Sequence, residues 1–96
     1  MDIAVTRFVR FENQGALQAF CDVSVGSAML IKGVRVVEGR TGPFVSMPRQ
    51  QNSIGKWYDN VVLLDGALRE KLIRRVLEAY RISQQTSEAG IGGSTR

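Results

Sequence analysis

Apolar and polar residues alternate along the first third of the chain, with the period of two that is typical of β-strands. Odd positions are mostly apolar from Ile3 to Phe11, and the alternation is regular from Leu17 to Val25. The short polar connection Asn13–Gly15 between these runs predicts a β-hairpin, because glycine readily adopts the positive φ of a tight turn. A third run, Met29 to Val37, follows a turn at Gly26-Ser27. The three runs together predict an antiparallel meander.

Two prolines bracket a fourth apolar run, Phe44–Met47. Proline cannot donate a ladder hydrogen bond, so this run is predicted to be an edge or crossover segment. The polar stretch 49–55 predicts an exposed loop. Lys56–Val62 is expected to form a last strand, with the Phe44–Met47 run as its candidate hairpin partner.

A helix is predicted after Asp65, whose carboxylate is a good N-cap. Its apolar stripe has a spacing of four residues and consists of Leu68, Leu72, Val76 and Tyr80. Residues 1–82 are therefore expected to form a single α+β domain, a small antiparallel sheet of four to five strands with a C-terminal helix packed on it. The polar residues 83–96 are predicted to be a disordered tail. An exposed edge strand in so small a sheet favours a homodimer that forms through strands.

Composition adds a basic charge balance to this picture. The 96-residue chain has 13 basic and 9 acidic residues, which gives a net charge of +4, and ten of the cations are arginine. Guanidinium groups suit phosphate recognition because they present planar, bidentate donors. The longest uncharged apolar run, Val61–Leu64, is far shorter than the ~20 residues of a membrane span. With no signal-peptide pattern at its start, the protein is expected to be cytoplasmic and to have no membrane partner.

The sequence offers little chemistry for catalysis. It contains no histidine, and its lone cysteine, Cys21, falls on the apolar side of a predicted strand, where a small buried side chain is expected. The carboxylates are scattered, and no phosphate-binding loop is present. We therefore predict no enzyme activity, no metal site, no cofactor and no small-molecule substrate.

Several basic residues are candidates for binding an anion. Arg40 lies in a glycine-containing turn, Arg49 and Lys56 flank the polar stretch, and Arg74 and Arg75 lie on the predicted helix. A cation beside an aromatic residue suits a phosphate with a stacked base, and Trp57 and Tyr58 follow Lys56. The alternative is purely structural: one of the two aromatic residues packs in the core, and the helix arginines are a solvated face.

Four segments resemble the stage V sporulation protein G (SpoVG) family: Ile31–Gly39, Gly42–Pro48 with its Phe-Val-Ser-Met-Pro sequence, Gly55–Asp59 and Val76–Tyr80. The resemblance covers roughly residues 1–81. It implies a small antiparallel sheet with a C-terminal helical segment, assembled as a dimer through its strands. It also implies a cytoplasmic bacterial protein that binds DNA and RNA and regulates gene expression, with links to sporulation and septum formation.

The family commonly has a basic pair soon after the Met-Pro dipeptide, whereas this chain has Arg49 followed by Gln50. Only Arg49 matches that charge, although an amide such as that of Gln50 also hydrogen-bonds phosphates and base edges. The resulting hypothesis is a homodimeric regulator that binds nucleic acid through its basic and amide side chains, namely Arg40, Arg49, Gln50, Lys56, Arg74 and Arg75. The alternative is a protein-interaction module of the cell-division machinery, which binds its partner by strand addition and binds no nucleic acid.

Overall fold

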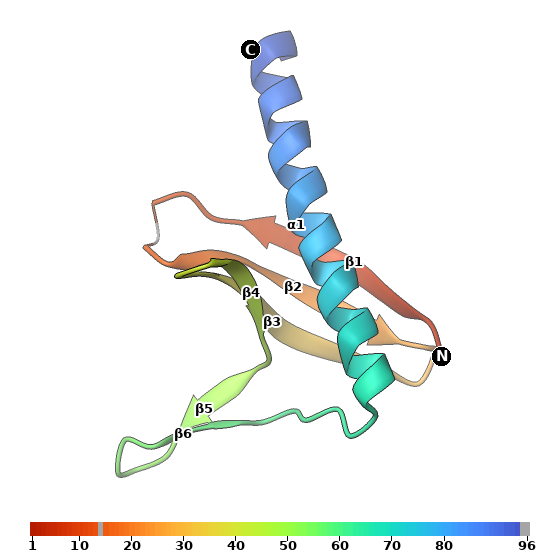
Figure 1. Ribbon diagram of the computed structural model, residues 1–96, viewed down its shortest axis with the longest axis vertical. Helices are drawn as coiled ribbons and strands as arrows, with labels where there is room; N and C mark the ends of the chain where they lie inside the picture. Colours follow the sequence, from red (N-terminus) through yellow and green to blue (C-terminus); the bar gives the residue numbers. More distant parts are fainter. Residues whose placement is uncertain (14, 95–96) are drawn as a thin grey trace.

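The computed structural model describes residues 1–13 and 15–94, with side chains described as far as residue 84. It has the predicted α+β architecture, in which a sheet of four antiparallel strands and a small two-stranded sheet precede a C-terminal helix (Figure 1). In chain order the elements are β1 (Ile3–Arg10), β2 (Leu17–Val25), β3 (Met29–Gly39), β4 (Gly42–Ser46), β5 (Arg49–Gln51), β6 (Trp57–Asp59) and α1 (Gly66–Ser94).

The larger sheet is a meander with the order β1-β2-β3-β4, so β4 is an edge strand, as Pro43 within it and Pro48 after it predict. The smaller sheet corrects two expectations. Arg49–Gln51 is not a loop but strand β5, and the strand β6 pairs with β5 and not with β4. Pro48 separates β4 from β5, and the turn that joins β5 to β6 is closed by Asn52, whose Oδ1 accepts hydrogen bonds from the backbone N–H groups of Ile54 and Lys56. A side-chain acceptor of this kind stabilises a tight turn without help from the rest of the fold.

A bulge in β3 sets which residues face the helix. The pairing register with β2 shifts between Cys21 and Asp22, so that Cys21 pairs with Val34 and Asp22 with Lys32. The extra residue, Gly33, has a φ of 86°, a conformation that favours glycine. Because of this insertion, Ile31 and Val34 both face the core, although they are three residues apart.

The core lies between one face of the four-stranded sheet and α1. The helix contributes the predicted stripe, in which Leu72, Val76 and Tyr80 are buried against alternate residues of the strands. The predicted N-cap is also confirmed, since Asp65 Oδ1 accepts hydrogen bonds from the N–H groups of Ala67 and Leu68. The Tyr80 hydroxyl donates a hydrogen bond to Gln18 Oε1 at 3.2 Å, which links α1 to β2. One helix therefore covers one face of the sheet (Figure 1).

Cys21 is fully buried in this core, as its place in the alternation predicts. Burial, and to a smaller extent the neighbouring Asp22 carboxylate, raises the pKa of the Cys21 thiol to about 11. At neutral pH this thiol is protonated and out of contact with solvent, which makes it a core residue and not a nucleophile.

The helix α1 continues to Ser94 and runs past the end of the sheet (Figure 1). The structure describes no side chains beyond residue 84, so the prediction that residues 83–96 form a disordered tail stays a prediction. Within residues 1–13 and 15–94, no helix is long and apolar enough to cross a membrane.

Candidate functional site

A groove of about 270 Å³ lies where the four-stranded sheet meets the β5–β6 ribbon. Its lining residues come from β3, β4, β5 and β6, and we call it the basic groove: Arg35, Val37, Phe44, Ser46, Arg49 and Trp57. Val36 and Val45, which alternate with these residues, pack in or against the core under α1. Since neighbours along a strand point to opposite faces, the basic groove lies on the face of the sheet turned away from the helix.

The ring of Phe44 is held across the end of β3. A Cβ atom at Gly39 would lie 2.9 Å from Phe44 Cδ1, so the ring lies close against the backbone of Gly39 and a larger residue there would have to displace it. Phe44 nevertheless keeps 49% of its surface exposed. One side of the ring is therefore covered by the backbone of Gly39, and the rest is exposed.

Arg49 connects the aromatic and acidic parts of the ribbon. Its Nε atom lies 3.1 Å from Asp59 Oδ1, and its guanidinium carbon lies 5.9 Å from the centroid of the Trp57 ring. The side chains of Arg49 and Asp59 are 42% and 49% exposed, so their ion pair is worth only about 0.2–1 kcal/mol. Such a pair orients the guanidinium while leaving its remaining donors available to an anion.

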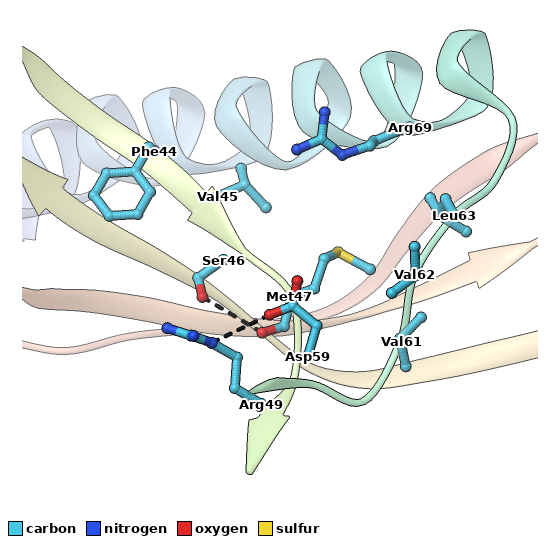
Figure 2. Close-up of a pocket in the computed structure, with 10 residues that line it drawn as sticks. All are labelled: Phe44, Val45, Ser46, Met47, Arg49, Asp59, Val61, Val62, Leu63 and Arg69. Atoms are coloured by element: carbon cyan, nitrogen blue, oxygen red, sulfur yellow. Dashed lines mark hydrogen bonds and ion pairs between the residues drawn. The ribbon is translucent and has the colours of Figure 1, made fainter. Parts of the chain in front are cut away.

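A second hollow, of about 300 Å³, follows the outer edge of β4 (Figure 2). We call it the edge hollow. Apolar side chains from β4 and from the segment before α1 line much of it, including Phe44, Val45, Val61 and Val62. Figure 2 shows Arg69 reaching toward it from α1, with the Arg49–Asp59 pair at the other end. Val62 is 64% exposed, so this hollow presents apolar surface beside a strand edge.

Of the six residues predicted to bind nucleic acid, Arg49 lines the basic groove. Gln50 pairs with Tyr58 on β6, which places both on the opposite face of the ribbon from Arg49 and Trp57. Lys56 ends the turn before β6, and Arg40 is exposed in the turn between β3 and β4. Arg74 and Arg75 lie on the exposed surface of α1 beside Lys71, Glu78 and Arg81. The structure thus separates the predicted cations into distinct surfaces.

The expectation that one of Trp57 and Tyr58 packs in the core is wrong. Both are exposed, by 50% and 42% respectively. The reason is that β5 and β6 form a two-stranded ribbon of their own and do not extend the larger sheet, so neither face of the ribbon meets the core under α1.

Sequence reasoning missed Arg35 and Phe44. The signal for Arg35 was present, because a cation between Val34 and Val36 on a strand must face away from the core that those valines enter. Phe44 carried no such signal, since an apolar residue in an edge strand is ordinarily expected to be buried.

The basic groove combines two guanidinium groups with two half-exposed aromatic rings. Arginine binds phosphate and carboxylate groups, and exposed rings stack on planar groups. Among the residues that the structure describes, no three His, Cys, Asp or Glu side chains gather as metal ligands. The chemistry that the groove offers is recognition of an anion that carries planar rings.

Comparison with known proteins agrees with the fold and the motifs. A family model described as SpoVG matches residues 1–82. Similar curated proteins include one from Archaeoglobus fulgidus, 31% identical over 83% of this chain and 94% of its own length, and one from Lachnospira eligens, 27% identical over 92% of this chain and all of its own. A third, from Brevibacillus brevis, is 29% identical over 94% of this chain and 99% of its own length. All three carry the name "Putative septation protein SpoVG".

Proposed function

Because this chain belongs to the SpoVG family, we propose that it is a homodimeric regulator of gene expression that binds nucleic acid through the basic groove. The relatives' names connect the family with septation, and a link to sporulation and septum formation is proposed on the same ground. The relatives' names describe a septation protein and no enzyme. A regulator that acts by binding needs no catalytic site.

The observation that carries the proposal is the composition of the basic groove. Arg35 and Arg49 meet Phe44 and Trp57 there, in a chain with a net charge of +4. Phosphate oxygens accept hydrogen bonds from guanidinium groups, while rings contribute stacking that tolerates any base. Lys56, next to Trp57 in the chain, adds a cation on the adjoining turn. Nucleic acid is the common biological polymer that combines regularly spaced anions with planar rings.

Salt dependence tests this proposal. Two phosphate contacts for each protomer predict that affinity falls at least about tenfold between 50 and 200 mM salt, because bound counterions are released on binding. The measurement is fluorescence anisotropy of labelled DNA and RNA oligonucleotides titrated with the full chain. Absence of binding at 50 mM salt, with the protein folded, would refute the proposed function.

The homodimer is proposed to form through the edge of β4. Within the described parts of the chain, no strand pairs with the outer side of β4, and the edge hollow beside it exposes Val62. Exposed strand edges with adjacent apolar surface are ready templates for pairing with a second copy. A dimer formed there would place two basic grooves on one continuous sheet. One long nucleic-acid chain could then occupy both grooves at once, which raises the overall affinity.

Val62→Asp is expected to convert the dimer, about 21 kDa, into the 10.6 kDa monomer, because the new carboxylate would be desolvated in the interface. Size-exclusion chromatography with light scattering measures this mass. Ile54→Asp is the matched control, since Ile54 is 83% exposed at the β5–β6 turn, away from β4. A dimer that survives Val62→Asp unchanged would place the interface elsewhere.

The same edge supports a second candidate function, recruitment of a division protein by strand addition. Backbone pairing at β4 would resist added salt, whereas phosphate binding weakens with it. The salt titration above therefore separates the two functions.

A further inference from the structure

The basic groove continues onto the open face of the four-stranded sheet. We define this open face by the exposed or partly exposed residues that alternate with the core positions: Arg7, Phe20, Lys32, Arg35 and Phe44. Pairing of the strands aligns them in rows across the sheet. Phe20 on β2 pairs with Arg35 on β3, and Arg35 pairs with Ser46 on β4. On β1 this row begins at Val9, and it leads across the sheet to the groove. Arg7 belongs to the next row, which continues through Asp22 to Lys32.

Cations and rings lie next to one another along this path. The guanidinium carbon of Arg7 lies 5.4 Å from the centroid of the Phe20 ring. The rings of Phe20 and Phe11 pack together with their centroids 5.3 Å apart. Arg35 follows on the next strand, then Phe44, and then Trp57 with Arg49 over its ring. The carboxylate that strands β1 to β4 place on this face, Asp22, is buried, whereas Arg7, Lys32 and Arg35 are exposed. Asp59, on the adjoining ribbon, is paired with Arg49. The open face is therefore positively charged where solvent reaches it.

The charge decides which occupant fits this face. A second copy of the chain packed face to face would bring two surfaces together that both carry the exposed cations Arg7, Lys32 and Arg35, and like charges brought together oppose association. A polyanion has the complementary charge. The exposed rings favour a single-stranded nucleic acid over a duplex. Bases in a duplex are stacked on each other and present only their edges, whereas bases of a single strand expose their faces to a protein ring.

We infer that the open face and the basic groove together form a track for single-stranded nucleic acid, in which bases stack on Phe44 and Trp57 and the backbone passes over Arg35 toward Arg7. This inference rests on the proposed function and deepens it. Phe44 suits the role because its ring lies against the backbone of Gly39 on one side and stays about half exposed to solvent. Trp57 suits it because Arg49 keeps its ring at the groove.

The test compares three ligands of the same length at low salt: a single strand, the matching duplex, and a single strand whose bases have been removed. The single strand should bind at least about fivefold more tightly than the other two, because stacking on a protein ring contributes at least that factor for each base. Trp57 is the sole tryptophan of the chain, so stacking on it should quench the intrinsic fluorescence. Arg7→Ser should weaken long strands more than short ones, since only long strands reach β1.

Phe44→Leu removes the ring but keeps an apolar side chain, and it should lower affinity for the single strand about fivefold or more. Tyr58→Leu is the matched control, because Tyr58 is similarly exposed but lies on the other face of the ribbon. If the duplex or the abasic strand binds as tightly as the single strand, or if Phe44→Leu and Tyr58→Leu behave alike, the track is wrong while the proposed function stands. If no ligand binds, both fail.

Discussion

Reversing both charges of the basic groove with Arg35→Glu/Arg49→Glu is expected to lower affinity for nucleic acid by at least about 100-fold. Hydrogen bonds to charged groups are each worth roughly 1.5–3 kcal/mol, and 1.4 kcal/mol is a tenfold change in the dissociation constant. The variant loses two such contacts and adds two carboxylates that repel phosphate. Anisotropy at 50 mM salt measures the loss, and circular dichroism checks that the fold is kept.

The chain offers a control of equal charge. Arg74→Glu/Arg75→Glu also takes the net charge from +4 to zero, but it changes the exposed surface of α1. If binding depended on net charge alone, the two double variants would lose affinity equally. We expect the α1 variant to lose less than about tenfold, since its residues lie across the sheet from the groove. A greater loss in the α1 variant than in the groove variant would move the binding surface to the helix.

Most of the fold could be predicted because its signals are local. Neighbouring residues specify each element: the alternation specifies β1 to β3, Pro43 and Pro48 mark β4 as an edge strand, and the Asp65 cap with the apolar stripe specifies α1. The β5–β6 ribbon could be predicted only in part, because a strand was expected at β6 but its partner β5 was expected to be a loop. The residues of β5 are polar, and the pairing depends on the Asn52 side chain, which accepts two backbone hydrogen bonds across the turn.

The candidate site was harder to predict because it is built from distant residues. Arg49 was found through its loop position and the family motif, but the groove also needs Arg35 from β3 and Phe44 from β4. Their meeting depends on the register of β3 with β4 and on the turn that brings Trp57 back beside Arg49. The register of β3 with β4 follows from the short turn between Gly39 and Gly42. The placement of the separate β5–β6 ribbon beside the sheet is a property of the assembled fold, which charge and spacing along the chain do not encode.

Leu72→Ala should lower the free energy of unfolding by about 3 kcal/mol, a large share of the roughly 5–15 kcal/mol typical of a native domain. Leu72 is fully buried and joins α1 to the sheet, so the truncated side chain leaves a cavity that the strands cannot close without shifting. Urea denaturation should show a lower midpoint with an unchanged slope. Ile82→Ala is the control on the same helix, because Ile82 is 47% exposed and its loss should cost less than about 1 kcal/mol. Since Leu72 and the basic groove lie on opposite faces of the sheet, the folded variant should bind nucleic acid as tightly as the parent, and a loss of both properties together would show that the two faces are coupled.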